Sequence, residues 1–254
     1  MNEDKVKLIL QDLEITYENW LRKLDVINNN VRYAGEPKLS ASSAGMCSLK
    51  HYFKMQKTPK VPVGMKSLKK MRLGTIVHED IQTSLEYFFK DYEITCELPV
   101  RYKNVKGHLD IVVKIDEETC IVLDIKTMAA YSWSFKYGKN ASQDSAKWNK
   151  LQLATYALGL METYNYKTVY MYLWNYNKNT SDMKFESIGP EYVEEAKVYW
   201  RDLDANLKTW DNTGFDNMMW LLIQAPNYKW ECGYCEYGHI CPVKGDKTQG
   251  GSNE

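Results

Sequence analysis

The sequence predicts an α/β protein in which helices flank a mixed β-sheet, with further helical segments at both ends of the chain. Apolar residues recur at helical spacing in several long segments, and short β-rich runs bounded by turn residues lie between them. With 254 residues, 44% of them hydrophobic and 26% charged, the chain is long enough for one substantial core and has the composition of a soluble globular protein.

The first third of the chain is predicted to be mostly helical. Helical spacing runs from the start to about Asn30, and residues 38–55 indicate a serine-capped helix start followed by an aromatic, basic helix. Residues 57–66, rich in Pro, Gly and Lys, are expected to form a loop. Residues 69–92 are again periodic. Their predicted buried stripe consists of Leu73, Ile76, Val77, Ile81, Leu85 and Phe88.

The middle of the chain is predicted to supply the sheet. A strand at residues 95–102 leads into a hairpin, whose apolar runs at 111–115 and 120–125 enclose the turn signal "DEET". Residues 127–145 are expected to be irregular, residues 146–164 helical, residues 168–176 a further strand and residues 190–210 an amphipathic helix.

The chain is thereby divided into four parts. Residues 1–72 form an N-terminal helical segment with one cysteine and a basic loop, and residues 73–190 form the α/β core. Residues 191–245 form a C-terminal helical and cysteine-bearing segment, and residues 246–254 form a polar tail that we expect to be disordered.

The hairpin carries acidic residues at its outer ends. Asp110 lies seven residues before Glu117 and Asp124 lies seven after it, so a fold-back near Glu117 places the two aspartates opposite each other. Cross-strand Cβ atoms are about 5 Å apart, close enough for both carboxylates to touch one cation. Lys126 lies two residues after Asp124 and therefore shares its face. The alternative is that the two aspartates have no role in binding, since charged residues are common at strand ends, where the strands meet water.

Two helices next to the hairpin offer further polar side chains. His78 lies among apolar residues in the helix before it, where a histidine is more often a core residue than a ligand. Gln152 and Tyr156 are four residues apart in the helix after it and share one face. On an otherwise apolar helix, such a pair is often only a polar strip at the edge of the buried face, without a functional role.

In this order, four short motifs resemble those of a known enzyme family. "GTIVHE" (74–79), "GHLD" (107–110), "LDIKT" (123–127) and "QLATY" (152–156) resemble the successive motifs of the PD-(D/E)XK nuclease superfamily, specifically its RecB-like branch. That branch includes nuclease domains of bacterial recombination helicase–nucleases, CRISPR-associated spacer-processing exonucleases and phage relatives. The resemblance implies a restriction-endonuclease-like core for residues 73–190.

The resemblance also implies roles for individual residues. It implies that Mg²⁺ or Mn²⁺ is ligated by His78, Asp110, Asp124 and the carbonyl oxygen of Ile125. It makes Lys126 the catalytic lysine, and it implies that Gln152 and Tyr156, as the "QxxxY" element, support the site and contact the nucleic acid. Hard oxygen ligands of this kind suit Mg²⁺ or Mn²⁺.

A separate group of cysteines is predicted to bind a metal. Cys232, Cys235 and Cys241 are spaced C-x2-C-x5-C, and Cys47 lies far upstream. Disulfides are disfavoured in a reducing compartment, so this spacing favours metal, and four thiolates suit either zinc or iron–sulfur. His239 leaves a mixed zinc site open. One cysteine before the core and three after it resembles the iron–sulfur members of the same branch, which implies a [4Fe–4S] cluster joining the chain ends, with structural Zn²⁺ as the alternative.

The predicted function is a divalent-metal-dependent DNA exonuclease that prefers single-stranded ends, in recombination, replication or repair. Net charge is zero, but residues 50–72 contain eight Lys or Arg and no Asp or Glu, and this block could contact phosphates or be a solvated loop. The alternatives are a catalytically silent nucleic-acid-binding scaffold and a structure-specific endonuclease. Recombination or replication proteins are possible partners, and the oligomeric state is open.

The sequence also predicts the compartment. No apolar run approaches the roughly 18 residues needed to cross a bilayer. The first residues, "MNEDKVKLILQDLE", are mixed and acidic, unlike a signal peptide. We therefore expect a cytoplasmic protein without membrane contact.

Overall fold

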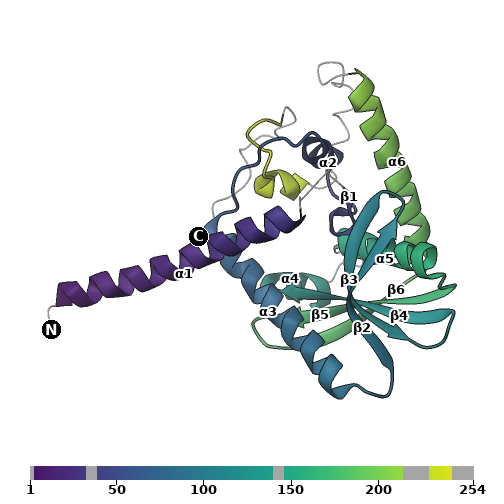
Figure 1. The fold of residues 1–254 in the computed structure, drawn as a ribbon, viewed down its shortest axis with the longest axis horizontal. Coiled ribbons are helices and arrows are strands. Elements are labelled where there is room, and N and C mark those ends of the chain that lie inside the picture. Colours follow the sequence, from purple (N-terminus) through teal and green to yellow (C-terminus); the bar gives the residue numbers. More distant parts are fainter. Residues whose placement is uncertain (1–2, 33–38, 140–145, 214–228, 242–254) are drawn as a thin grey trace.

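The computed structural model describes residues 3–32, 39–139, 146–213 and 229–241 (Figure 1). In chain order the elements are α1 (Glu3–Arg32), β1 (Leu39–Ser40), the 3-10 helix η1 (Ala41–Ser43), α2 (Ser48–Met55), α3 (Met65–Phe88), β2 (Glu93–Tyr102), β3 (Val105–Lys114), β4 (Thr119–Met128), α4 (Ala130–Tyr137), α5 (Lys147–Tyr164), β5 (Thr168–Asn177), β6 (Met183–Ile188), α6 (Glu191–Thr213) and the 3-10 helix η4 (Lys229–Tyr234). The α/β class with a mixed, helix-flanked sheet is confirmed.

The sheet has the strand order β1-β3-β4-β5-β6, with β2 paired to the other side of β3. The pairs β2/β3, β3/β4 and β5/β6 are antiparallel, and β1/β3 and β4/β5 are parallel. The crossover from β4 to β5 runs through α4 and α5, as a parallel pair requires a long connection. β1 and β4 pair with the same edge of β3 at opposite ends, and "GHLD" lies between these two pairings.

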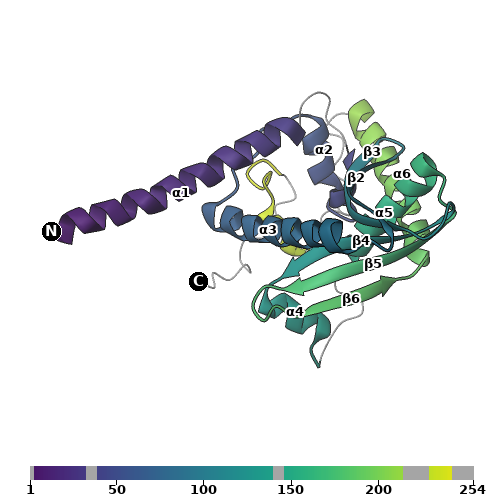
Figure 2. The ribbon, with the colours of Figure 1, turned by 60° about the horizontal axis from the view of Figure 1, so that its bottom comes forward.

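Helices cover the two faces of the sheet (Figures 1 and 2). On one face α5 lies in the main core, where Leu153, Ala154, Ala157 and Leu160 are fully buried, and α6 packs behind it. On the other face Ile81 of α3 packs against Ile111 and Ile125 in a smaller cluster. The strands therefore alternate between two apolar layers, and polar side chains on either face must be paired.

Several sequence predictions need correction. In α3, Val77, Ile81 and Leu85 pack on the sheet, but Leu73 is 54% exposed, Ile76 45% and Phe88 84%. The stripe was wrong at these three positions. The side of α3 on the sheet is rotated toward Gly74 and His78, since a Cβ atom at Gly74 would lie 3.2 Å from Oγ1 of Thr127 in β4, so Leu73 and Ile76 lie on another side, and Phe88 is at the end of the helix. The N-terminal part of the helix lies beside α1, where Lys69 contacts Glu18 at 2.7 Å.

Two local structures also differ from expectation. Residues 130–137, expected to be irregular, form α4, and the helix α2 is capped by Cys47 without a side-chain hydrogen bond, not by a serine. Tertiary contacts hold α4 in place: Lys136 forms an ion pair with Glu186, and Lys184 lies 4.7 Å from the ring centre of Tyr137. Strand β6 was not predicted. The tail at 246–254 lies outside the described residues.

No helix in the described part of the chain is both long and apolar enough to span a membrane.

Candidate active site

The outer ends of the hairpin bring the two predicted aspartates together. The β3/β4 ladder pairs Ile111 with Leu123, so Asp110 and Asp124 are the next residues on their strands, as the fold-back at Glu117 predicts. Asp110 Oδ2 accepts a hydrogen bond of 2.7 Å from the backbone N–H of Ile125. Asp110 is 8% exposed and Asp124 1% exposed. Two carboxylates therefore face each other in a nearly dry part of the sheet.

Lys126 and the helix α5 complete a polar network on the same face. The Nζ atom of Lys126 lies 2.6 Å from Oδ2 of Asp124 and donates a hydrogen bond of 3.0 Å to Oε1 of Gln152. The amide nitrogen of Gln152 donates to Oδ1 of Asp124 at 3.2 Å and to the hydroxyl of Tyr156 at 3.1 Å. Gln152 thus fixes the lysine and the carboxylate relative to each other.

His78 of α3 reaches the site from the opposite side. Its Nδ1 atom lies 3.4 Å from Oδ2 of Asp110. Burial lowers the pKa of His78 below its ordinary value, and the nearby charge of Asp124 only partly offsets that effect. The neutral imidazole is favoured at neutral pH, and a neutral imidazole can ligate a metal.

The electrostatics of the carboxylates indicate where a cation fits. Burial, followed by the negative charge of Asp124, raises the pKa of Asp110 well above its usual range, and Lys126 acts in the opposite direction. Oδ2 of Asp124 is buried and ion-paired with the ammonium of Lys126 at 2.6 Å, and within the described residues no further hydrogen bond reaches it. A divalent cation would offset the repulsion between the carboxylates of Asp110 and Asp124. Their oxygen atoms are ligands that fit Mg²⁺ or Mn²⁺.

The predicted ligands are neighbours, but they do not form a closed cage. Over residues 3–32, 39–139, 146–213 and 229–241, no three His, Cys, Asp or Glu side chains are arranged to hold an ion. Instead, the carboxylates of Asp110 and Asp124 contact the N–H of Ile125, the imidazole of His78 and the ammonium of Lys126.

Two residues beside the site were missed in the sequence. Gln82, one turn after His78 on α3, donates hydrogen bonds of 3.0 Å to the carbonyl of Asp110 and to Oε1 of Glu97. Glu97 interrupts the β2/β3 ladder opposite Asp110 and has a φ of +51°, which a non-glycine residue rarely adopts. The i, i+4 spacing of His78 and Gln82 was the one available signal, because the strain at Glu97 arises from tertiary packing.

Gly107 of "GHLD" is required by close packing. A Cβ atom at this position would lie 2.5 Å from Cε1 of Tyr156 and 3.1 Å from Cβ of Ala41. The glycine therefore lets the ring of Tyr156 approach the backbone of β3 and hold Gln152 over the carboxylates.

The cysteine-bearing segments lie next to each other. The backbone N–H of Val61 donates to the carbonyl of Glu236 at 3.0 Å, and the Phe53 and Tyr237 rings lie 5.4 Å apart. Burial raises the pKa of the Cys47 thiol to about 11, and Cys241 is near enough to contribute to that shift. Cys232 and Cys235 belong to the same C-terminal segment, but the four thiols are not arranged as a metal site within the described residues.

The basic block at residues 50–72 is partly neutralised. Lys50 lies 3.3 Å from Glu236, Lys69 lies 2.7 Å from Glu18, and Arg72 lies 3.3 Å from Glu79. At least these three of the eight cations are ion-paired within the described residues, which weakens the case for the block as one phosphate-binding surface.

The mixed sheet carries two buried carboxylates and a lysine at the ends of adjacent strands. A His-bearing helix and a "QxxxY" helix flank it. Together these features define a nuclease fold. The family model described as the PD-(D/E)XK nuclease superfamily matches residues 83–242, well over half of the chain. The chain belongs to the PD-(D/E)XK nuclease superfamily. A search of curated protein sequences found no match.

Two solved structures share the fold. SSO0001 superposes with a TM-score of 0.58 at 18% identity, over 89% of this chain and 96% of that one. A protein designated an exonuclease, from Eubacterium rectale, gives a TM-score of 0.50 at 14% identity, over 84% of this chain and 92% of that one. At these identities the likeness establishes the shared fold.

Proposed function

We propose that the chain is a divalent-metal-dependent deoxyribonuclease of the RecB-like branch, which hydrolyses phosphodiester bonds as an exonuclease on single-stranded ends. The observation that carries the proposal is the convergence of His78, Asp110, Asp124 and Lys126, from three neighbouring elements, on one buried polar site. The acids and the lysine are all present, which argues against a catalytically silent scaffold.

The proposed chemistry assigns a task to each side chain. His78, Asp110, Asp124 and the carbonyl oxygen of Ile125 would hold Mg²⁺ or Mn²⁺. A bound divalent ion lowers the pKa of a coordinated water and stabilises charge on phosphate oxygens. The ammonium of Lys126, 2.6 Å from Asp124, offsets negative charge and orients a water for attack on phosphorus. Gln152 holds that lysine, and Tyr156 holds Gln152.

The preference for single strands is supported by α4, which begins two residues after β4. Tyr131 is 82% exposed and Phe135 is 54% exposed, and because they are four residues apart they share one face of the helix. Exposed aromatic rings stack on unpaired bases whatever their sequence. Nearby, Lys184 stands over the rings of Trp133 and Tyr137 and adds positive charge.

We also propose that Cys47, Cys232, Cys235 and Cys241 hold a structural [4Fe–4S] cluster, with Zn²⁺ as the alternative metal. The proposal is supported by the packing of the Cys47 helix against the C-terminal segment. A nuclease acting on free ends would serve recombination, replication or repair and meet proteins of those processes.

The test is a digestion assay with end-labelled linear and circular single-stranded DNA, with and without Mg²⁺ or Mn²⁺. We expect metal-dependent loss of the linear substrate only. Lys126→Ala should lower the rate by about 10²–10⁴-fold, and Asp124→Ala should abolish digestion. Glu117→Gln, an exposed change in the turn of the same hairpin, is the control and should digest normally.

Each other outcome has a defined meaning. Undiminished digestion by purified Asp124→Ala would refute the assigned site. DNA retention in a gel shift by the unmodified protein, without metal-dependent products, would favour the scaffold function. Cleavage of the circular substrate would favour an endonuclease.

A further inference from the structure

The N-terminal helix α1 is much longer than its contact with the rest of the protein requires. It has 30 residues and is therefore about 45 Å long. In Figures 1 and 2 its N-terminal half extends beyond the body of the molecule. The contacts with the body lie further along: Lys69 reaches Glu14 at 3.7 Å and Glu18 at 2.7 Å, the Arg22 side chain bonds the carbonyl of Val63, and Leu21 is 3% exposed.

A second side of α1 carries apolar residues at alternating spacings of three and four. The series is Leu10, Leu13, Tyr17, Trp20, Leu24 and Ile27. Leu10 is 59% exposed, Leu13 62%, Tyr17 46%, Trp20 43% and Ile27 46%. Val6 extends the same spacing toward the N-terminus, so the pattern covers about three heptads. A 3-4 repeat of this length is typical of a coiled-coil seam.

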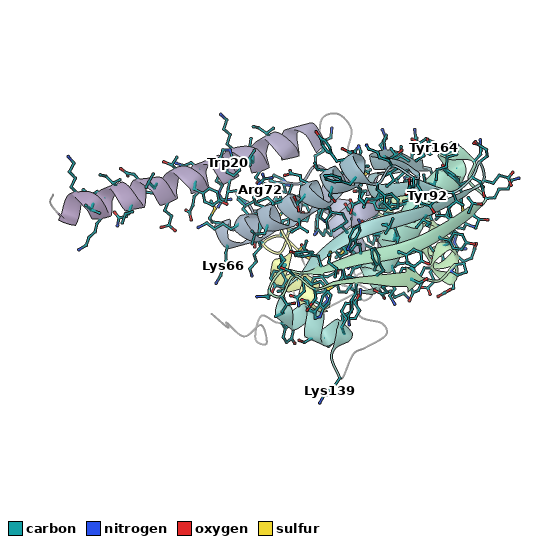
Figure 3. All side chains as sticks on the ribbon, turned by 90° about the horizontal axis from the view of Figure 1, so that it is seen from below. Trp20, Lys66, Arg72, Tyr92, Lys139 and Tyr164 are labelled. Carbon is teal, nitrogen blue, oxygen red and sulfur yellow. The ribbon has the colours of Figure 1, made fainter. Side chains whose placement is uncertain are left out.

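The body of the protein leaves most of this seam exposed, with Leu24 half-buried. If Leu10, Tyr17 and Leu24 are a positions, Leu13, Trp20 and Ile27 are d positions. The residues that contact the body then lie at b, e and f: Glu18 at b, Glu14 and Leu21 at e, and Arg22 at f. Glu18 and Arg22 are about a quarter turn or more from the seam, whereas Glu14 and Leu21 flank its a positions, so the body borders the seam on its e side. Arg72 of α3 touches the seam itself at one d position, since its guanidinium lies 5.6 Å from the ring centre of Trp20 (Figure 3).

We propose that two copies of this chain associate through α1 as an antiparallel coiled coil. A second copy supplies an identical seam, and burial of leucine and aromatic side chains is the main driving force of such association. The antiparallel direction follows from the shape: the C-terminal half of each α1 lies on its own body, so antiparallel helices keep the two bodies at opposite ends of the pair.

Charge complementarity supports the same direction. When Leu10 of one copy faces Leu13 of the partner copy, Val6 faces the partner's Tyr17, and Lys7 at an e position faces the partner's Glu14, also at e. Glu14 also lies 3.7 Å from Lys69 of its own chain, so its carboxylate would be shared by two lysines. Flanking pairs of opposite charge at such positions set the orientation of coiled coils. The pair occurs twice because of the two-fold symmetry of a homodimer.

The helix provides a matched control for the seam. Leu8 and Leu13 are the same residue type and are almost equally exposed, at 61% and 62%. Leu8 is at an f position, away from the seam, and Leu13 is at d. A general apolar association would respond to both positions alike, whereas a coiled coil responds to Leu13 alone.

The experiment measures the mass of the full chain by sedimentation equilibrium over a wide concentration range. We expect a dimer for the unmodified protein and for Leu8→Glu, and at least a tenfold weaker association for Leu13→Glu, with helix content unchanged in circular dichroism. A monomer at all concentrations, or equal weakening by Leu8→Glu and Leu13→Glu, would overturn the proposal.

A charge exchange tests the direction. Lys7→Glu should weaken the dimer, because it faces Glu14 of the partner copy, and the double variant Lys7→Glu/Glu14→Lys should restore it. Failure of the double variant to restore association would refute the antiparallel pairing. The result does not depend on nuclease activity.

Discussion

Some charged residues of this protein are buried, where a charge is energetically unfavourable unless a neighbouring group of opposite charge or a hydrogen-bond donor compensates it. Asp110 and Asp124 are almost fully buried and repel each other, and Lys126 and the N–H of Ile125 provide the compensation that the chain itself offers. Removing one member leaves another uncompensated, so residues that do not touch a substrate also determine whether the site keeps its geometry.

Gly107 gives a prediction of this kind. Gly107→Ala would place a Cβ atom 2.5 Å from the ring of Tyr156, so that ring must move and its hydrogen bond with Gln152 must weaken. We expect a loss of about 1–3 kcal/mol in the free energy of unfolding, typical of overpacking, and a lower rate of DNA digestion. Urea denaturation and the digestion assay measure the two effects.

Gly64 is the control for this substitution, since a Cβ atom there meets nothing within 4 Å. Gly64→Ala should leave the rate of DNA digestion unchanged and lower the free energy of unfolding by less than about 1 kcal/mol, because Gly64 is the N-cap of α3 and alanine is a poorer cap. If Gly107→Ala behaves like Gly64→Ala, Tyr156 does not depend on the glycine.

His51 predicts a pH dependence of stability. It is 2% exposed, and its Nε2 atom lies 3.1 Å from the carbonyl oxygen of Ser43 and 3.0 Å from the hydroxyl of Tyr199. Burial, with a smaller effect from Lys54, lowers the pKa of His51 from 6.5 to about 3. As pH falls below 6.5, His51 is protonated in the unfolded chain but stays neutral in the folded protein. Stability is therefore lost progressively as the pH falls from 6.5 toward 3.

The slope of this loss is about 1.4 kcal/mol per pH unit from His51 alone. His51→Gln removes the titrating group, so its free energy of unfolding should fall less steeply with acidification than that of the unmodified protein. Urea denaturation at several pH values between these limits measures the difference, and parallel curves for the two proteins would contradict it.

At the scale of elements, α4 links β4, which carries Asp124 and Lys126, to the surface. Lys136 anchors the helix to β6 through Glu186, and the opposite face exposes Tyr131 and Phe135. The anchor turns the aromatic face outward next to the end of β4. A short helix with this construction can bring a base close to the scissile phosphate.

Tyr131→Ala and Phe135→Ala should therefore weaken the binding of single-stranded oligonucleotides by about 1–3 kcal/mol per lost stacking partner. Double-stranded binding should change much less. Fluorescence anisotropy with labelled oligonucleotides measures both. Tyr87→Ala is the control, because Tyr87 is 69% exposed but lies at the far end of α3. Equal losses for Tyr131→Ala and Tyr87→Ala would exclude a specific platform.

The elements show what the sequence can predict. The long helices, β5 and the hairpin follow from periodicity, and the hairpin register follows from the turn at Glu117 alone. The pairing of Asp110 and Asp124 was therefore predictable because it depends on local chain reversal. The helix α4 was not, since its serines, aromatics and flanking glycine favour helix weakly and Lys136 stabilises it from a distance.

The same distinction holds within the site. Sequence spacing predicted that Lys126 shares the face of Asp124, and the motifs suggested His78 and Gln152. Glu97 and Gln82 depend on where α3 and β2 meet, which no local pattern specifies. Leu73 and Ile76 are exposed although they were predicted to be buried, because apolar spacing marked one side of α3 while the side on the sheet is rotated toward Gly74 and His78.

On the scale of the whole molecule, segments from before and after the core pack against each other. The α2 helix packs against the C-terminal segment through the rings of Phe53 and Tyr237, and Lys50 forms an ion pair with Glu236. This closes a loop of about 190 residues between Cys47 and Cys241, and closing such a loop is entropically costly. A metal held by the four cysteines would stabilise the closure.

Cys47→Ser should therefore remove the metal and lower the melting temperature, with the contact between α2 and the C-terminal segment lost first. The unmodified protein should be brown, with broad visible absorbance, if the metal is an iron–sulfur cluster, and colourless with bound zinc if it is zinc. Elemental analysis and absorbance distinguish the two metals. Cys96→Ser is the control, because Cys96 packs near Ile111 in the other apolar layer and should leave the metal in place. If the purified protein contains neither metal, or if Cys47→Ser melts like Cys96→Ser, side-chain packing alone holds the two segments together.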